Sequence, residues 1–502
     1  MKSMKSIQMF AIMAASVTML LSSCSSSDEP ATTTPTQTIA VGNVINPDGV
    51  QEYAITGDQT LPKGTYILKG WCYVTAGATL TIAPGTIIKG DKDTKAALIV
   101  EPGGKLYAEG TATAPIVFTS ENEPGKRLPG DWGGIIICGK AKNNRGTMQI
   151  EGGPRTVHGG DDDTDNSGVL RYTRIEFAGY PFAVDQEING LTLGSVGSGT
   201  TIDHVQVSYS NDDSYEWFGG AVNCKNLIAY HGWDDDFDTD YGYSGKVQFF
   251  LGVRNPRIAD TSYSNGFESD NNADGSSTSP YTTVTFTNGT LVGPIGQATD
   301  FTNTKDYTAS ADGLNPNNGS KNGVFQAAMH IRRNSKLNCF NTVALGYPVG
   351  LILDAEKGNP GTPSFAETGD LKLQNLFFAG MGVLGSDINK KLTDYYSSDG
   401  KTEDVTKVSN SHTFFVKTAN GNQNFSDISS LGLKQPNSKA AAANYGPPTT
   451  GSPLLGAASF VDNMLNTPFF TKVTYVGAFA SNNTADDWTA GWANFDPQNT
   501  VY

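Results

Sequence analysis

The fold is decided by residues 79–110, which repeat one short pattern of strand, turn and strand. Thr79–Gly90 reads TLTIAPGTIIKG, and Ala97–Gly110 reads ALIVEPGGKLYAEG. Apolar and polar residues alternate with a period of two on either side of a Pro-Gly turn, as expected for short β-strands. One such turn of chain cannot bury its apolar face alone, whereas a stack of them forms a continuous core. The pattern therefore predicts an all-β solenoid.

The same pattern continues along most of the chain. A third short strand is predicted at Ala114–Ser120, and Gly130–Ala141 reads GDWGGIIICGKA. Further rungs are predicted at residues 170–177, 188–193, 201–209, 221–230, 246–253, 281–291, 325–332, 337–345 and 371–378. We therefore expect the solenoid, which the resemblance described next identifies as a parallel β-helix, to span residues 51–385. Residues 386–502 are predicted to form an irregular excursion and a C-terminal cap, because an uncovered last rung would pair with other chains.

Residues 79–141 resemble the right-handed parallel β-helix of the pectin-lyase-like superfamily. More narrowly, the chain is similar to Bacteroidetes cell-surface lipoproteins of that fold, whose C-terminal hallmark is echoed by Val473–Phe479 and Asp486–Trp492. The resemblance covers nearly everything from about residue 52 to the last residue of the sequence. It implies a fold and a cellular setting. It does not imply one activity, because this fold hosts lyases, hydrolases, adhesins and binding proteins alike.

Residues 1–23 are predicted to be a signal peptide. Lys2 and Lys5 precede the apolar run Met9–Leu21, and two serines stand before Cys24. A basic end, an apolar run and small residues before the cleavage point are typical of a secretory signal. The stretch resembles a bacterial lipoprotein signal, which implies that Cys24 is lipidated. The alternative is a simple secreted protein.

The residues that follow are predicted to be a disordered tether. Residues 24–50 are rich in Ser, Thr and Pro, and a tract with few apolar residues cannot offset the entropy of ordering. Ser25–Glu29 resembles the short acidic tag that sends Bacteroidetes lipoproteins to the outer face of the outer membrane. We therefore expect a protein that is lipid-anchored in the outer membrane and exposed at the cell surface.

Composition excludes one class of partner. The chain has 50 acidic and 35 basic residues and a formal net charge of −15. Nucleic acid is excluded, because phosphate binding requires clustered Lys and Arg. Cations, neutral sugars and basic protein surfaces remain compatible. Cys72, Cys138, Cys224 and Cys339 show no CxxC spacing, and buried free thiols are favoured over the disulfides that export would permit.

Acidic and aromatic residues recur together in three segments, residues 211–220, 232–242 and 264–275. The offsets from Asp213 to Asp236 and from Asp236 to Glu268 are 23 and 32 residues, about one rung each. The acids are therefore expected to lie above one another on one face, where like charges repel unless cations are present. The predicted metal ligands are Asp212, Asp213, Asp234, Asp236, Asp238 and Asp240. Calcium is the natural candidate cofactor, because it takes six to eight oxygen ligands in flexible geometry. The alternative is a set of solvated acidic loops.

The aromatic residues of these segments suggest a ligand-binding face. Trp217, Trp233, Phe237 and Tyr241 lie among the acids, a mixture suited to stacking on sugar rings or holding a cation. The alternative is that they are ordinary core aromatics.

An enzyme is the rival interpretation. β-Helix pectate lyases, which this chain resembles, pair calcium-holding aspartates with an arginine base. That resemblance makes Arg254, Arg332 and Arg333 candidate catalytic residues. A glycoside hydrolase on this fold would instead need two carboxylates at a fixed separation.

These observations favour a binding protein. The sequence predicts a lipid-anchored surface module that captures a glycan or another nutrient through its acidic-aromatic face. The cellular setting of similar proteins implies an outer-membrane transporter as a partner, in addition to the membrane itself. A calcium-dependent polysaccharide lyase or glycoside hydrolase is one alternative, and a structural adhesin is another.

Overall fold

The computed structural model describes residues 39–183, 186–309, 313–316, 318–359, 361–433 and 445–502. The predicted signal peptide and Cys24 lie outside the described residues. No helix among the described residues is long and apolar enough to span a membrane.

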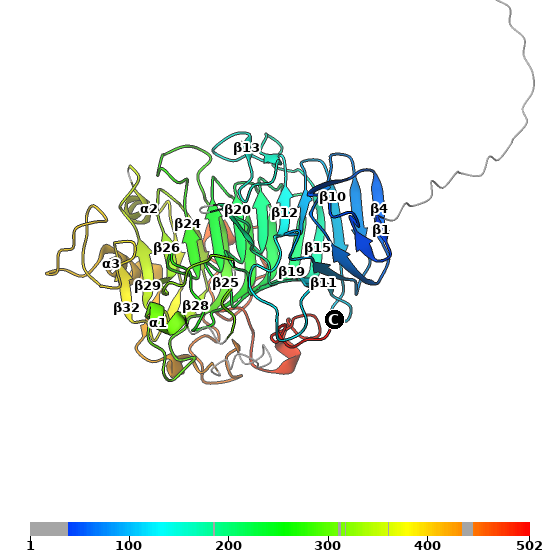
Figure 1. Ribbon diagram of the computed structural model, residues 1–502. Helices are drawn as coiled ribbons and strands as arrows, with labels where there is room; N and C mark the ends of the chain where they lie inside the picture. Colours follow the sequence, from blue (N-terminus) through cyan, green and yellow to red (C-terminus); the bar gives the residue numbers. More distant parts are fainter. Residues whose placement is uncertain (1–38, 184–185, 310–312, 317, 360, 434–444) are drawn as a thin grey trace, which may run out of the picture. The chain divides into compact units, whose positions relative to one another are not determined.

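Two long sheets run along the molecule, and their neighbouring strands are almost all parallel (Figure 1). One sheet consists of β3 (Glu52–Ile55), β6 (Trp71–Val74), β9 (Ala97–Val100), β12 (Gly134–Cys138), β18 (Leu191–Gly194), β20 (Tyr215–Phe218), β22 (Phe237–Asp240), β24 (Phe267–Ser269), β26 (Ala327–Ile331), β29 (Val349–Leu353) and β32 (Val383–Ser386). We call it the short-strand sheet.

The second sheet consists of β1 (Ala40–Val41), β2 (Val44–Ile45), β4 (Asp58–Leu61), β5 (Thr65–Leu68), β7 (Thr79–Ile82), β8 (Ile87–Gly90), β10 (Lys105–Glu109), β11 (Ile116–Ser120), β15 (Gly168–Glu176), β19 (Thr201–Ser208), β21 (Asn223–Tyr230), β23 (Lys246–Val253), β25 (Thr285–Val292), β27 (Asn338–Phe340), β28 (Val343–Leu345), β30 (Leu373–Gln374), β31 (Phe377–Ala379) and β33 (Gln423–Phe425). We call it the long sheet. The chain passes from one sheet to the other in each rung, so the predicted parallel β-helix is confirmed.

Smaller elements decorate the rungs. Two antiparallel pairs are formed by β13 (Met148–Gln149) with β14 (Val157–His158) and by β16 (Pro181–Ala183) with β17 (Gln186–Glu187). The helices in the described residues are α1 (Lys305–Thr308), α2 (Thr362–Thr368) and α3 (Asn410–Phe415), with short 3-10 turns at Thr418–Asn420, Ile428–Leu431, Asn463–Leu465 and Thr484–Asp486. Helix α3 packs against β29 and β32 and thereby covers the last rung of the short-strand sheet.

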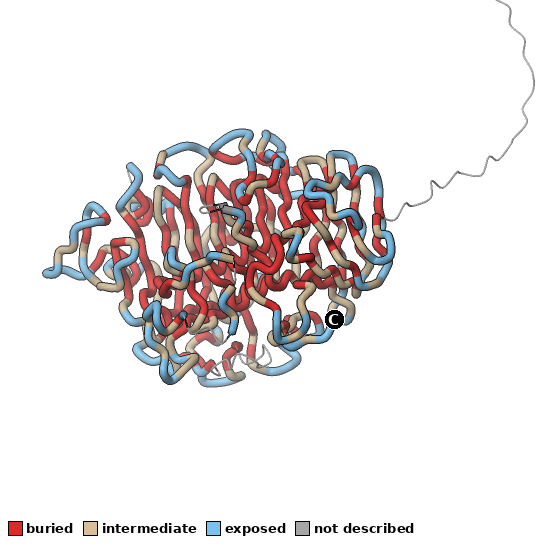
Figure 2. The backbone as a smooth tube through the Cα atoms, in the orientation of Figure 1, coloured by how far each residue is buried: buried red, intermediate tan, exposed pale blue. Residues whose placement is uncertain are grey.

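Strand alternation produces the core. In β7 the side chains of Leu80 and Ile82 are buried and those of Thr79 and Thr81 are not. The same inward positions on successive rungs form one apolar cluster that runs through the helix, which Figure 2 shows as buried segments along both sheets. The Pro-Gly turns permit close stacking: a Cβ on Gly104 would lie 2.3 Å from the Val74 carbonyl oxygen of the neighbouring rung. All four described cysteines are buried free thiols, as the spacing indicated.

The first rung begins earlier than predicted. Residues 39–50 were expected to be part of the tether, but β1 and β2 form an antiparallel pair, and β2 adds in parallel to β5. Ile39 and Ile45 are buried in the central cluster. These two apolar side chains explain the difference, because they give the segment a face to bury that the preceding Ser, Thr and Pro tract lacks.

The C-terminal region is more than a cap. Strand β33 extends the long sheet beyond β31, and the chain then returns along the outside of that sheet. Residues 457–502 form this returning segment, which we call the strap; Figure 1 shows it in orange and red. Its backbone contacts Asn375 and Asn341 first and then Gln248. It turns back to Asn288 and Asn341 at residues 475–477 and finally reaches Gln206, so its two ends lie on rungs in the reverse of the chain order.

Side-chain amides hold the strap by its backbone. Gln248 donates to the Thr471 carbonyl oxygen at 2.7 Å and accepts from the Thr471 N–H at 2.7 Å. Gln206 pairs in the same way with Asn494, and Asn341 pairs with Ser459. Each amide therefore imitates one step of β-pairing and provides partners for one N–H and one carbonyl group of the strap backbone.

We expect Gln248→Leu to lower the free energy of unfolding by about 1–3 kcal/mol, because it removes two hydrogen bonds to the Thr471 backbone, each contributing about 1 kcal/mol. Urea unfolding monitored by tryptophan fluorescence measures the change. Gln51→Leu, at an exposed position, is the matched control and should leave the midpoint unchanged. Equal midpoints for both variants would show that the amide does not hold the strap.

Candidate functional site

The register of the short-strand sheet places a column of ionisable side chains on its outer face. Glu216 of β20 pairs with Asp238 of β22, which pairs with Glu268 of β24, which pairs with His330 of β26. The residues that alternate with them along each strand, such as Trp217, point into the core. Alternation along each strand therefore directs one residue inward and the next toward this column.

A second column lies in the turns that precede these strands. The Asp235 N–H donates to Asp213 Oδ1 at 2.8 Å, and the Asn265 N–H donates to Asp235 Oδ1 at 2.5 Å. The Ala327 N–H in turn donates to Asn265 Oδ1 at 3.1 Å. This side-chain ladder holds four successive turns in one register, and it fixes the orientation of the Asp213 carboxylate.

Two overlapping groups of carboxylates have the geometry of metal-ligand sets. One consists of Asp212, Asp213 and Asp234, and the other of Asp213, Glu216 and Asp238. Within each group one oxygen from every residue lies within 4.8 Å of the others. Asp213 belongs to both groups. We call the five residues together the acid cluster.

Ionisation of the acid cluster is unfavourable in the absence of a cation. Burial first, and neighbouring carboxylates second, raise the pKa of all five side chains well above the ordinary value. Among the described residues, no Lys, Arg or His forms an ion pair with any of them. Asp234 and Asp238 each keep one buried carboxylate oxygen with no hydrogen-bond partner in the described structure. The cluster therefore has the charge and the free oxygens to bind a cation.

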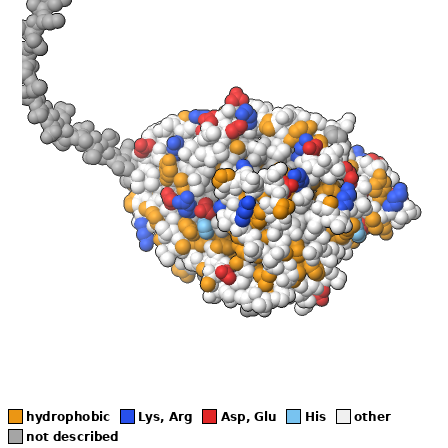
Figure 3. Space-filling model, turned by 180° about the vertical axis from the view of Figure 1, so that it is seen from behind, with side chains coloured by type: hydrophobic (Ala, Val, Ile, Leu, Met, Phe, Trp, Pro, Cys, Tyr) orange, Lys and Arg blue, Asp and Glu red, His pale blue; other side chains and the backbone are white. Residues whose placement is uncertain are grey.

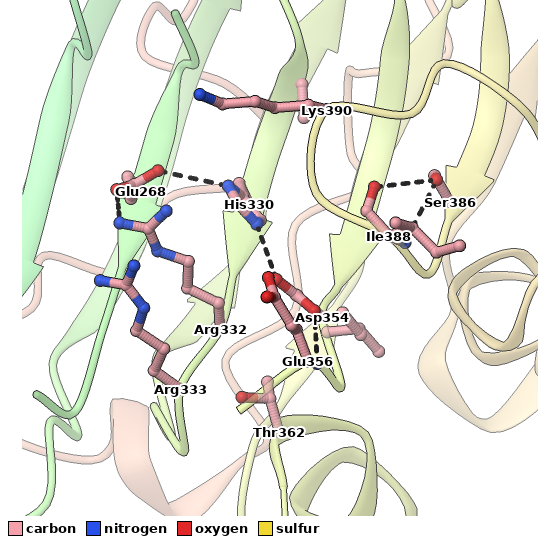
Figure 4. A network of polar contacts seen from close by, with 12 residues as sticks. Glu268, His330, Arg332, Arg333, Asp354, Glu356, Thr362, Ser386, Ile388 and Lys390 are labelled. Carbon is pink, nitrogen blue, oxygen red and sulfur yellow. Dashed lines mark hydrogen bonds and ion pairs between the residues drawn. The ribbon is translucent and has the colours of Figure 1, made fainter. Parts of the chain in front are cut away.

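Farther along the column the carboxylates are paired with cationic side chains. Glu268 forms an ion pair with Arg332, and its Oε2 lies 3.2 Å from His330 Nδ1 (Figure 4). Asp270 accepts from Arg332 at 2.7 Å and from Arg333 at 2.6 Å. Burial alone would raise the pKa of Glu268, but Arg332 and His330 lower it to about 2. This carboxylate is ionised and already has partners.

Two of the six predicted metal ligands lie outside the carboxylate groups. Asp236 turns into the wall of the helix and forms an ion pair with Arg254 at 2.8 Å, with both side chains fully buried. Asp240 accepts the Tyr241 N–H at 2.6 Å and belongs to neither group. Glu216, which was not among the predicted ligands, takes a place in the second group. Glu216 lies between the inward-facing Tyr215 and Trp217, so strand alternation could have indicated that its side chain faces outward.

Three of the four aromatic residues predicted to bind a ligand are buried in the core. Trp217, Trp233 and Phe237 are 0% exposed. Trp217 and Phe237 stack with Tyr215 inside the core, which is the alternative that the sequence left open. Tyr241 is partly exposed and packs on Phe218 at a ring distance of 5.7 Å. The three buried rings stabilise the rungs that carry the acids and are not accessible to a ligand, whereas the role of Tyr241 stays a prediction.

The three candidate catalytic arginines are all bound to carboxylates. Arg254 is fully buried against Asp236, and Arg332 and Arg333 hold Glu268 and Asp270. Burial opposes the charged form, yet the nearby carboxylates raise the pKa of Arg254 above its ordinary value and that of Arg332 well above it. An arginine held in this way is a poor general base, because a base must lose its proton near neutral pH.

The acid cluster is a local feature. On the face turned away from the viewer of Figure 1, Lys and Arg side chains are interspersed with Asp and Glu, and no large area of one sign stands out (Figure 3). The protein is thus a parallel β-helix with one concentrated acidic site on the outer face of its short-strand sheet.

Comparison with known proteins agrees with this class. The family model described as a pectate-lyase-like beta helix domain matches residues 53–432, and the chain belongs to that family. The crystal structure of pectate lyase Pel9A is similar over 81% of this chain and 89% of that chain, with 12% sequence identity and a TM-score of 0.36. The Dettilon tailspike protein is similar over 67% of this chain and 60% of that chain, with 12% identity and a TM-score of 0.24. No curated protein matches the sequence.

Glu216 and Glu268 offer a paired test, because they occupy the same column with opposite surroundings. Without divalent cations at pH 7, we expect Glu216→Gln to raise the free energy of unfolding by about 1 kcal/mol, roughly the value of one pKa unit. Glu268→Gln should lower it by about 2 kcal/mol, because it removes the carboxylate charge that pairs with both Arg332 and His330. Urea unfolding in chelator measures both, and changes of the same sign would contradict this description of the charge.

The same shifts predict a pH dependence. The acid cluster has folded-state pKa values above those of the unfolded chain, so the folded state keeps protons that the unfolded state has lost. In chelator the melting temperature should therefore fall as pH rises from about 4, the ordinary carboxyl range, toward neutrality. Glu268 acts in the opposite direction and only below that range. A melting temperature that rises steadily between pH 4 and 7 would show that folding does not raise the pKa values of the acid cluster.

Proposed function

We propose that the acid cluster binds a calcium ion and that the bound ion helps the protein to hold an anionic glycan at the cell surface. The proposal is based on the two sets of three carboxylates that share Asp213. The buried oxygens of Asp234 and Asp238 that lack hydrogen-bond partners support it.

Calcium suits these ligands better than other common metals. All the ligand atoms are carboxylate oxygens, which hard cations prefer, and the groups contain no Cys or His. The carboxylates come from one face of a sheet and its turns, so they approach an ion from one side. Open coordination positions on the other side would be available to oxygen atoms of a ligand.

A sugar with an acidic substituent fits the arrangement. Its carboxylate would complete the coordination of the ion, and the cationic side chains of Arg332 and Arg333 lie at the next positions of the same face. Binding is favoured over cleavage because the arginines considered as bases are held by carboxylates. The chain would thus capture a polysaccharide without cutting it.

The cellular setting is part of the proposal. Lipidation at Cys24 would tether the β-helix to the outer membrane and leave the acid cluster outside the cell. A captured glycan could then pass to an outer-membrane transporter. The similarity of the N-terminal residues to lipoprotein signals supports this placement, as does the acidic tag after Cys24.

The cation is tested by isothermal titration calorimetry of the chelator-treated protein with calcium. We expect the wild-type protein to bind, and Asp213→Asn to weaken binding by at least about tenfold, because this carboxylate belongs to both groups. Asp58→Asn, at an exposed position on β4, is the control and should bind normally. If calcium neither binds nor raises the melting temperature of the wild-type protein, the proposal fails.

The glycan is tested by native gels that contain a polyuronide. We expect calcium to retard the wild-type protein, chelator to abolish the retardation, and Asp213→Asn to migrate freely in both. A chelator-sensitive increase in unsaturated-product absorbance would instead favour the lyase alternative.

The anchor is tested by Cys24→Ser in the native host. Without lipid chains the protein should move from the membrane fraction to the soluble fraction, because two or three acyl chains provide the membrane affinity. Protease treatment of intact cells should degrade the wild-type protein if it is exposed. Unchanged membrane association of Cys24→Ser would contradict a lipid anchor.

A further inference from the structure

Tyr263 is a partly exposed aromatic residue that borders the acid cluster. Its backbone φ is +88°, a region that bulky residues rarely occupy. The neighbouring Ser262 donates a 2.5 Å hydrogen bond to the Asp234 carboxylate, and the Asn265 side chain donates to the Tyr263 carbonyl oxygen at 3.0 Å. The acid cluster and its ladder therefore hold this residue in an unfavourable conformation, as is common for residues that contact ligands.

Lys390 reaches the same place from a loop that follows β32. Its side chain is exposed, and its Nζ lies 5.3 Å from the centre of the Tyr263 ring. Figure 4 shows this side chain extending above Glu268 and His330 on the outer face. Lys390 forms no ion pair with any described residue, so its ammonium group is available to a ligand.

One hydrogen-bonded chain connects both residues to the acid cluster. The backbone N–H of Lys390 donates to Gln326 Oε1 at 2.5 Å, and Gln326 Nε2 donates to Asn265 Oδ1 at 3.2 Å. Asn265 also holds Tyr263 and belongs to the ladder that ends at Asp213. Although Tyr263 and Lys390 are far apart in sequence, they are fixed relative to each other and to the predicted cation ligands.

We infer that Tyr263 and Lys390 form a sugar-binding subsite next to the acid cluster, in which the ring of Tyr263 stacks on a pyranose and Lys390 binds its anionic substituent. The inference rests on the proposed function and adds a second contact to it. An aromatic face packs against the apolar face of a sugar ring, and a lysine ammonium acts as a compact point charge for an anion. The cation–π contact positions Lys390 over the ring before a ligand arrives.

This subsite supplies the aromatic contact that the buried rings cannot. Trp217, Trp233 and Phe237 are inaccessible, whereas Tyr263 is partly exposed and adjoins Asp234 through Ser262. If the carboxylate of one sugar binds the cation, the next sugar of the polysaccharide could stack on the ring of Tyr263.

The experiment measures the affinity of a hexamer of galacturonic acid by calorimetry in saturating calcium. We expect Tyr263→Leu to weaken binding about fivefold through loss of stacking, and Tyr263→Phe to bind like the wild-type protein. Lys390→Met should weaken binding about fivefold and reduce its dependence on salt, and Lys390→Arg should retain most of the affinity. The matched controls are Tyr395→Leu and Lys391→Met, at exposed positions of the same loop.

Calcium alone, titrated into each variant, separates the subsite from the cation site. The inference requires that Tyr263→Leu and Lys390→Met bind calcium normally and lose only the hexamer. Normal calcium binding together with wild-type affinity of both variants for the hexamer overturns the subsite, as does a wild-type protein that binds calcium but not the hexamer. Failure of the wild-type protein to bind calcium overturns the proposed function itself. Lys390→Met, at an exposed position, keeps the test valid if Tyr263→Leu is poorly folded.

Discussion

The in-register parallel pairing of β20, β22, β24 and β26 is the constraint on which the rest of the structure depends. Parallel strands place equivalent residues about 4.8 Å apart, so a residue type repeated once per rung becomes a column. In the interior the columns are aromatic and apolar, and they hold the rungs together. On the outer face the same register brings carboxylates to a separation at which they repel. The fold thus concentrates charge that no single rung would gather.

The acid cluster lowers the stability of the folded chain. Its carboxylates are partly removed from water and form no ion pair with a cationic side chain in the described part of the chain, whereas Glu268 and Asp270, at the neighbouring positions, are paired with arginine and histidine. The difference lies within one continuous column, so it does not reflect a general shortage of basic residues. Strain and unbalanced charge are retained in proteins where a ligand compensates them. The aromatic core beneath the cluster supplies stability that offsets this local cost.

Much of the fold could be predicted from the sequence, because the Pro-Gly turns and the period-two alternation are local signals. The acidic elements were found through their spacing, which approximates one rung. Which way each side chain points was harder to predict: Asp236 stands in a corner, where strand alternation does not apply, and it turns inward to Arg254. The aromatics of the same segments face the core for the same reason that Glu216 faces outward. Tyr263 and Lys390 share no sequence signal, since loops of unequal length bring them together.

The strap has a consequence for how such a protein can change over evolutionary time. Solenoids commonly gain or lose length by duplicating or deleting one repeat, because each repeat contacts only its neighbours. Here one returning segment is hydrogen-bonded to Gln206, Gln248, Asn341 and Asn375, which belong to different rungs. An added or deleted rung would shift every later attachment point out of step with the strap. Variation should therefore accumulate in the loops of existing rungs, while the number of rungs that the strap crosses stays constant among descendants.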